Sequence, residues 1–282
     1  AKGVYMEPIH LHHTKKNPLI IPALLADRRG LFEKRGLKVY LDLAEDFTFD
    51  GNKPFIEGKS DVMMGDLTFF FYILEQGKKA VLTSNLTRTI HLVGRKGLTP
   101  PYKGIKVGVN RKGLFRLYLE NDLKDIVPDA KIVWMNNSYE RMQALEKGEI
   151  DALVAIEPFV TDLTEKGHHI IWSTRNSDKN LVMWAFGQTF YEKHRESVQA
   201  FHNALEEAGQ LFNALESKEK VKVCHQELGY PLAFAERMAN FEFENQAPIR
   251  LEDFNLCMEW MYRENEITRL YDGKELIKQS LC

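Results

Sequence analysis

Hydrophobic residues follow two alternating patterns along the chain. Short runs rich in Val and Ile alternate with longer stretches in which apolar residues recur at helical spacing. Strands that alternate with helices are typical of crossover units and a mainly parallel sheet. The pattern therefore predicts an α/β protein.

Two such series follow one another. The first predicts strands at residues 4–11, 37–43, 61–65 and 80–84, with helices at 18–29 and 67–76. Gly and Pro residues between 97 and 104 mark a change of unit. The second predicts strands at residues 105–109, 132–135 and 152–156, with a helix at 139–147. From residue 197 onward the pattern is helical, so we expect two similar α/β halves followed by a helical tail.

The loops after the strands are the places where we expect ligand contacts. Two lobes side by side leave a cleft, and small ligands bind at domain interfaces and at the carboxyl ends of parallel strands. The candidate ligand-binding residues are His12, His13, Asn17, Asp66, Thr68, Phe69, Ser84, Asn85, Asn110, Arg111, Lys112, Gly113, Arg116, Asn136, Glu157 and Trp184.

Composition narrows the function classes. The 282 residues include 38 Lys and Arg and 40 Asp and Glu, a formal net charge of −2. A nucleic-acid binder shows a basic excess, so we expect no nucleic-acid partner. The chain is 44% hydrophobic and 28% charged, as in ordinary globular proteins. No run approaches the ~20 apolar residues that a bilayer span needs.

Metal and disulfide chemistry is not indicated. The cysteines are Cys224, Cys257 and Cys282. Their spacing excludes a thiolate metal cluster and a disulfide-stapled scaffold. His10, His12 and His13 could suggest a metal site, but no nearby Cys or spaced His–Glu pair completes a tetrahedral set. We expect no metal and no cofactor, and we expect the histidine segment to contact the ligand by hydrogen bonding or stacking.

Residues 110–116 are the candidate anion site. They follow a strand and open a helix, so backbone N–H groups and the helix dipole favour an anion there. Arg111, Lys112 and Arg116 add charge, and Gly113 allows close approach of the backbone. The alternative is a solvated basic turn.

Other polar candidates have structural alternatives. Glu157 ends an apolar strand and suits hydrogen-bond donors such as an aminopyrimidine, but it could instead cap the next helix. Asp66 is placed to cap the helix that follows it, and we expect capping as its main role. Phe69 and Trp184 are expected to line the ligand pocket, whereas most other aromatic residues are expected in the hydrophobic core. Persuasive Ser-His-Asp, paired-carboxylate or phosphate-loop motifs are absent from the sequence.

Several segments resemble, in order, the type II solute-binding proteins. They are similar to the group that joins sulfonate, nitrate and taurine binders to thiamine-pyrimidine binders and synthases. The matching segments are residues 17–26, 29–39, 57–62, 104–109 and 145–152, within a resemblance that covers about residues 4–215.

The resemblance implies a two-lobed periplasmic binding protein of type II that closes on a small molecule and hands it to the permease of an ABC importer. Its hinge crossings would fall near residues 84–92 and 182–188, which gives a first lobe of residues 1–88 and 185–282 and a second of 89–184. We expect a monomer outside the cytoplasmic membrane, in the periplasm or held by a lipid anchor. Pyrimidine-binding members have a Glu at the place of Glu157, so a thiamine-precursor pyrimidine is favoured over an alkanesulfonate.

The alternative from another class is a cytoplasmic enzyme on the same scaffold, either like the pyrimidine synthase or a small-acid lyase. The synthase carries a lysine for pyridoxal phosphate and a histidine where this chain has Asp66 and Phe70. Neither side chain can form a Schiff base, which argues against synthase chemistry. A third alternative is a sensor or regulatory lobe of a larger chain.

Overall fold

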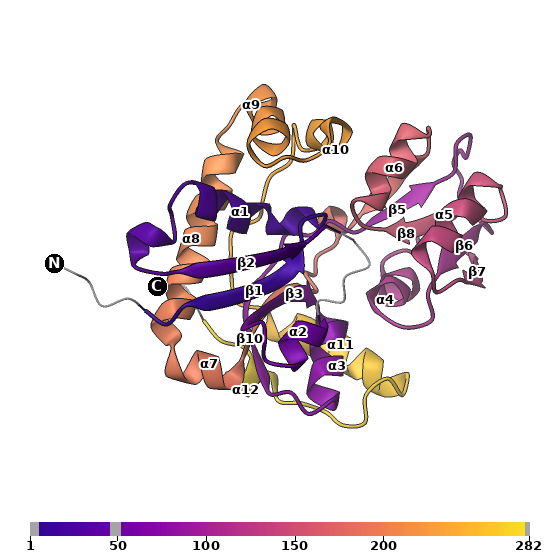
Figure 1. Ribbon diagram of the computed structural model, residues 1–282. Helices are drawn as coiled ribbons and strands as arrows, with labels where there is room; N and C mark the ends of the chain where they lie inside the picture. Colours follow the sequence, from indigo (N-terminus) through magenta and orange to yellow (C-terminus); the bar gives the residue numbers. More distant parts are fainter. Residues whose placement is uncertain (1–5, 46–51, 280–282) are drawn as a thin grey trace. The chain divides into compact units, whose positions relative to one another are not determined.

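The computed structural model describes residues 6–45 and 52–279. The chain divides into two compact units: unit 1 comprises residues 1–87 and 180–282, and unit 2 comprises residues 88–179 (Figure 1). Within the described ranges, none of the helices is long and apolar enough to cross a membrane.

The core of unit 1 is a five-stranded sheet in the order β2-β1-β3-β10-β4. Its strands are β1 (Ile9–Thr14), β2 (Val39–Ala44), β3 (Val62–Asp66), β4 (Ala80–Asn85) and β10 (Val182–Gly187). β1 pairs in parallel with β2 and β3, whereas β10 lies antiparallel between β3 and β4. Four strands therefore point the same way, and their carboxyl ends meet at one edge.

Unit 2 repeats this topology in the order β7-β6-β8-β5-β9. Its strands are β5 (His91–Gly94), β6 (Lys106–Val109), β7 (Lys131–Trp134), β8 (Ala152–Ala155) and β9 (His169–Ser173). β6 pairs in parallel with β7 and β8, and β5 lies antiparallel between β8 and β9. The mainly parallel sheets that the sequence predicts are confirmed in both units.

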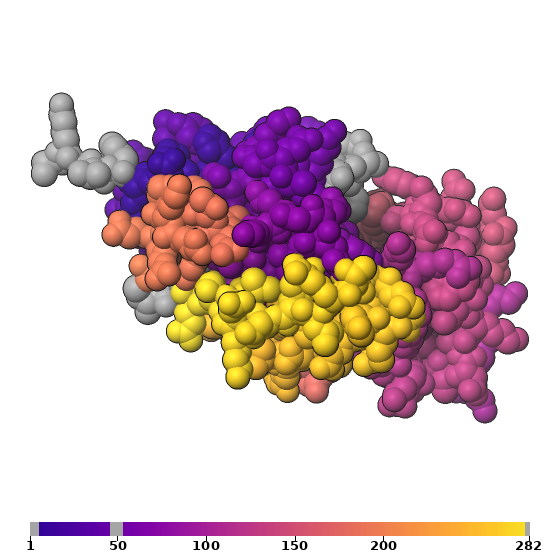
Figure 2. Space-filling view, turned by 90° about the horizontal axis from the view of Figure 1, so that it is seen from below, coloured from indigo at the N-terminus to yellow at the C-terminus, as the bar shows by residue number. Residues whose placement is uncertain are grey.

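Helices cover the sheet of unit 1. They are α1 (Ile21–Arg28), α2 (Asn52–Ile56), α3 (Leu67–Glu75), α7 (Gln188–Lys193), α8 (Arg195–Asn213), α9 (Ser217–Lys222), α10 (Leu232–Arg237), α11 (Leu251–Arg263) and α12 (Gly273–Leu276), with short turns η1 (Pro18–Ile20), η2 (Glu33–Arg35) and η4 (Val223–Glu227). Phe201 of α8 is fully buried, and its ring contacts Trp184 and Phe186 of β10. Phe71 of α3 meets Phe254 of α11 at 5.0 Å between ring centroids. Figure 2 shows this C-terminal part of the chain, in yellow, beside residues of the α3 region in purple.

The helices of unit 2 follow three of its strands. They are α4 (Leu114–Asn121), α5 (Ser138–Glu146) and α6 (Phe159–Glu165), and a short turn η3 (Thr174–Asn176) follows β9. Tyr118 of α4 is fully buried and packs on Trp172 of β9, with ring centroids 5.6 Å apart.

Three expectations differ from the structure. The first strand begins and ends later than predicted, so His12 and His13 lie in β1 and not in the loop after it. The reason is that pairing with β2 continues as far as Thr14. Residues 241–250 contain no helix or strand although their pattern is helical, and residues 182–187 of the expected second hinge form strand β10 in the sheet of unit 1.

Candidate functional site

Each unit presents candidate residues at the carboxyl edge of its own sheet. In unit 1 these are Asn17, Asp66, Thr68, Phe69, Ser84 and Asn85, and in unit 2 they are Asn110, Arg111, Lys112, Gly113, Arg116, Asn136 and Glu157. Most of the candidates that the sequence gives therefore lie at the carboxyl ends of the strands. These side chains differ in whether their polar groups already have partners within the protein or remain accessible to a ligand.

Asp66 caps helix α3. Its Oδ1 accepts hydrogen bonds from the backbone N–H groups of Thr68 at 2.8 Å and Phe69 at 3.3 Å, and from the Thr68 hydroxyl. Burial raises the pKa of the Asp66 carboxyl above its ordinary value. Thr68 is buried and uses its hydroxyl to hold Asp66, whereas the Phe69 ring is 42% exposed. The predicted capping role fits this geometry, and Phe69 is the accessible side chain of the three.

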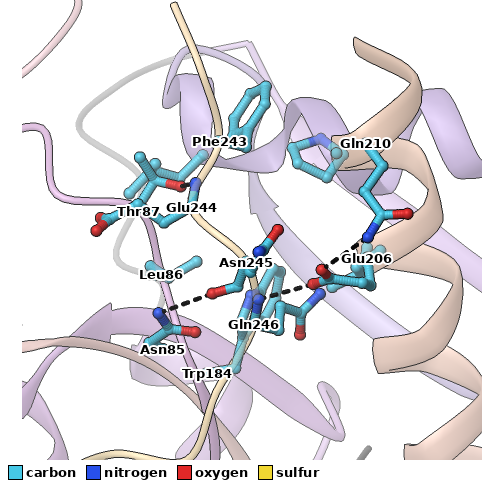
Figure 3. A pocket seen from close by; sticks show the side chains of 14 residues that line it. Asn85, Leu86, Thr87, Trp184, Glu206, Gln210, Phe243, Glu244, Asn245 and Gln246 are labelled. Carbon is cyan, nitrogen blue, oxygen red and sulfur yellow. Dashed lines mark hydrogen bonds between the residues drawn. The ribbon is translucent and has the colours of Figure 1, made fainter. Parts of the chain in front are cut away.

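Ser84 and Asn85 hold the irregular segment 241–250. The Asn85 amide donates to the backbone oxygen of Asn245 at 3.2 Å (Figure 3). Its oxygen accepts from the N–H of Ala247 at 2.9 Å. The buried Ser84 hydroxyl donates to the backbone oxygen of Ala247 at 3.4 Å. These two side chains, which the sequence assigns to ligand, have partners within unit 1.

The polar residues of β1 and its loop have different roles. His12 lies 3.1 Å from the Asp42 carboxylate, measured from Nδ1 to Oδ2. Burial lowers the pKa of His13 to about 4, and its Nε2 is buried without a hydrogen-bond partner among the described residues. Asn17 caps η1 by accepting from the Leu19 N–H at 3.1 Å. His13 is therefore a neutral imidazole at this edge of unit 1.

Trp184 faces the interior of unit 1. It is 3% exposed, and its ring packs against Phe201 at 5.4 Å and His202 at 6.3 Å between centroids. It also lines a cavity of about 30 Å³ between α8 and segment 241–250 (Figure 3). That volume holds about two water molecules.

Two larger open hollows lie elsewhere on unit 1. Their volumes are about 490 and 510 Å³, and both are lined by Lys78 and Lys79 just before β4 begins. This is the end of β4 opposite to Asn85. None of the predicted ligand residues lines either hollow.

The loop between β6 and α4, residues 110–113, concentrates positive charge in unit 2. Gly113 precedes α4 with a φ of 102°, and no side chain caps the first N–H groups of this helix. The Cζ atoms of Arg111 and Arg116 lie 4.7 and 5.7 Å from the centroid of the Trp134 ring. Arg116 pairs with Glu120 at 2.8 Å. In the described part of the chain, neither Arg111 nor Lys112 has an ion-pair partner, and both are exposed.

Two asparagines shape this β6–α4 loop. Asn136, after β7, accepts the Arg111 N–H on its Oδ1 at 3.0 Å. The Asn110 amide donates to the backbone oxygen of Lys112 at 2.7 Å, and its Oδ1 is buried without a hydrogen-bond partner among the described residues. Asn110 and Asn136 therefore fix the backbone that carries the positive charges.

Glu157 follows β8 and is 7% exposed. Its Oε2 accepts from the Thr161 N–H at 3.1 Å and from the Thr161 hydroxyl at 2.6 Å. The carboxylate thus contacts the first turns of α6, as the capping alternative predicts.

Sequence reasoning misses one charged residue near the loop. Arg141 of α5 is 4% exposed and donates to the backbone oxygen of Met135 at 2.6 Å and to the Ser138 hydroxyl at 3.0 Å. Burial lowers the pKa of its guanidinium. The signal was available, because Arg141 stands three and four residues before the buried Ala144 and Leu145, on the stripe where an apolar side chain is expected.

Metal ligation has no geometric support in residues 6–45 and 52–279. They contain no group of three or more His, Cys, Asp or Glu side chains placed to hold an ion. No protein-family model matches the chain, and no curated protein matches it.

Solved structures do match. The periplasmic aliphatic sulphonate binding protein SsuA from Escherichia coli superposes with a TM-score of 0.77 at 14% identity, over 96% of this chain and 97% of that chain. The chain has the periplasmic binding protein fold. The alkanesulfonate-binding protein SsuA from Xanthomonas axonopodis, bound to MOPS, gives 0.72 at 13% identity over 99% of each chain. The periplasmic nitrate-binding protein NrtA from Synechocystis gives 0.60 at 13% identity, over 86% of this chain and 74% of that chain. These likenesses confirm the predicted periplasmic binding protein fold class.

Proposed function

We propose that this periplasmic binding protein fold is the solute-binding component of an ABC importer, that it acts outside the cytoplasmic membrane as a monomer, and that it binds and releases a small organic anion. The observation that carries the proposal is the β6–α4 loop, where Arg111 and Lys112 stand beside the uncapped amino end of α4. The folds that it resembles include binding proteins for sulfonates and for nitrate.

The chemistry of the loop favours an anion. The amino end of a helix carries roughly +0.5 of a charge, and its first N–H groups point at a ligand placed there. A guanidinium grips a carboxylate or sulfonate through two parallel hydrogen bonds. The guanidinium of Arg111 lies over Trp134, with 4.7 Å between its Cζ and the ring centroid, so part of its side-chain freedom is already restricted before it binds.

A thiamine-related pyrimidine is the second candidate ligand. The sequence favours this pyrimidine because of Glu157, whose buried carboxylate could accept a hydrogen bond from an amino group. Thr161 already donates two hydrogen bonds to Oε2 of Glu157, so a pyrimidine would share this carboxylate with α6. We therefore place a small anion first and the pyrimidine second.

Binding without reaction agrees with the state of the buried acids. A lyase on this scaffold needs a general acid or base within hydrogen-bond reach of its substrate. Asp66 and Glu157 are the two carboxylates among the candidate residues, and both accept hydrogen bonds from the helices that follow them. Their role in this proposal is structural.

Native mass spectrometry of the purified full chain tests the proposal. We expect a co-purified anion of defined mass, and in a thermal melt we expect ethanesulfonate or MOPS to raise Tm in a concentration-dependent way. At a ligand concentration 100 times Kd the expected stabilisation is about 2.7 kcal/mol. A Tm shift with 4-amino-5-hydroxymethyl-2-methylpyrimidine alone would favour the second candidate, and a turnover product would overturn the transport function.

A further inference from the structure

Arg141 is a buried cation without a buried anion. Its side chain is 4% exposed, and its guanidinium hydrogen bonds go to the neutral backbone oxygen of Met135 and the neutral hydroxyl of Ser138. Among the described residues no carboxylate forms an ion pair with it, and Glu140, its neighbour on α5, exerts the attractive field on its charge. A charge buried in this way costs free energy unless another charge offsets it.

The stem of Arg141 packs over strand β6. A Cβ built on Gly108 of β6 would stand 3.7 Å from the Cγ of Arg141, an ordinary contact, and 2.7 Å from the Cδ1 of Ile150, a clash. Arg141 therefore passes over the strand that leads into the β6–α4 loop, and the glycine is required by Ile150.

One short segment connects Arg141 to the loop. Arg141 donates to the oxygen of Met135 at 2.6 Å, and Met135 donates its own N–H to Val109 at 3.0 Å. The next residue, Asn136, accepts from the N–H of Arg111. The guanidinium thus lies behind the backbone that carries the exposed charges.

The local electrostatics add to the free-energy cost of burying the charge of Arg141. Arg141 sits near the amino end of α5, where the helix dipole repels a cation. The amino end of α4, Arg111 and Lys112 add positive potential in the same part of unit 2. Glu120 pairs with Arg116, and Glu140 is the acid whose field acts on Arg141.

We propose that Arg141 is a positioning residue for the ligand's anionic group, that it holds Met135 and Asn136 behind the β6–α4 loop, and that its buried charge makes this loop attract anions. This rests on the proposed function of the chain. The ligand is the charge that offsets Arg141, acting through the loop without touching the guanidinium.

A purely structural role is the alternative. In that case solvent screens the guanidinium charge from the loop, and a neutral side chain of the same length would leave the electrostatic potential at the loop unchanged. Trp134 reports that potential, because it is 37% exposed and lies under Arg111, whereas Trp172, Trp184 and Trp260 are 3–6% exposed. Iodide, an anionic quencher, will therefore quench mainly Trp134.

The first experiment measures fluorescence quenching of the full chain at low ionic strength, with iodide and with neutral acrylamide. Arg141→Met should lower the iodide Stern–Volmer constant about twofold and leave the acrylamide constant unchanged, because one charge behind the loop is lost. Arg141→Lys should keep most of the iodide effect. As matched controls, Ser138→Ala keeps the charge, and Arg95→Met removes a cation that is paired with Asp151 at 2.8 Å. If Arg141→Met does not fold, Arg141→Gln replaces it.

The second experiment titrates ethanesulfonate and MOPS into the same variants by calorimetry. We expect Arg141→Met to raise Kd at least tenfold and Arg141→Lys to stay within about threefold of the wild type. Equal Kd and equal iodide quenching in wild type and Arg141→Met would overturn the role of Arg141. If the wild type binds neither sulfonate, the proposed function fails, and the iodide comparison still decides whether Arg141 charges the loop.

Discussion

The imidazole of His202 joins Thr83 of β4 to Gln246 of the irregular segment. Its Nε2 lies 2.8 Å from Oγ1 of Thr83, and its Nδ1 lies 2.6 Å from Oε1 of Gln246. An amide oxygen can only accept, so Nδ1 carries the proton and Nε2 accepts from the Thr83 hydroxyl. The ring is fully buried, and burial lowers its pKa to about 4. A neutral histidine therefore links three segments that lie far apart in the sequence.

His202 should make stability fall in mild acid. Its folded pKa of about 4 lies below the ordinary value of 6.5, so the unfolded chain binds the proton more tightly. The contribution is complete above pH ~6.5 and is lost as the pH falls towards ~4, with a slope of up to about 1.4 kcal/mol per pH unit. His202→Gln should flatten this slope in a series of denaturant melts between pH 4 and 7.

His13 provides the matched comparison. Burial lowers its pKa to about 4 as well, so His13→Gln should remove a separate part of the same slope. As a control, His169→Gln changes a half-buried histidine of β9 and should keep the pH slope of the wild type. Identical slopes in the wild type and both buried-histidine variants would contradict the assignment.

Asn85 should contribute more to the stability of the fold than to ligand binding. Asn85→Ala removes the hydrogen bonds to Asn245 and Ala247, each worth about 0.5–1.5 kcal/mol, so we expect a loss of roughly 1–3 kcal/mol. Tm should fall by several degrees. Asn121→Ala, which removes a hydrogen bond within α4, is the control. A higher Kd for ethanesulfonate with an unchanged Tm would instead indicate that Asn85 contacts the ligand.

Asp66 is expected to act through its position and not through its charge. Asp66→Ala should cost about 0.5–2 kcal/mol because α3 loses its cap. Asp66→Asn keeps an accepting oxygen and avoids a buried carboxylate, so it should match or exceed the wild type at pH 7. Since burial raises the pKa of Asp66, lowering the pH should narrow the difference between these two forms. Equal losses in both variants would show that the charge is needed.

The sequence predicts the strands well because their burial follows from periodicity. Runs such as residues 80–84 and 105–109 become buried strands of the two sheets, β4 and β6. Segment 241–250 is predicted poorly for a physical reason. It falls within the helical tail expected from residue 197 onward, but Asn85, Asn213 and Lys220 bond its backbone groups, and these tertiary partners are invisible to a local pattern.

The candidate site likewise has a part that the sequence predicts and a part that it does not. The location of the candidates follows from where strands end, which the pattern gives directly. What each side chain does depends on its nearest donors and acceptors, so Ser84 and Asn85 turn out to hold the chain itself. The sequence does not identify Arg141, because a charged residue in a helix is ordinarily expected to be exposed. Only its packing over β6 shows that it is buried.

The ligand class can be decided by two neutral substitutions. Lys112 is exposed on the β6–α4 loop, so Lys112→Gln removes one charge with little change in stability and should weaken binding of ethanesulfonate several-fold, most clearly at low salt. Glu157→Gln keeps a hydrogen-bond acceptor for Thr161 and should leave ethanesulfonate binding unchanged or slightly tighter, because a negative charge is lost. For the aminopyrimidine the order reverses: Glu157→Gln should weaken it and Lys112→Gln should not. Calorimetric Kd values for both ligands on both variants measure this directly, with Arg95→Met as a charge control away from the loop. If neither ligand responds to either substitution, the strand-end loops of unit 2 are not where the solute binds.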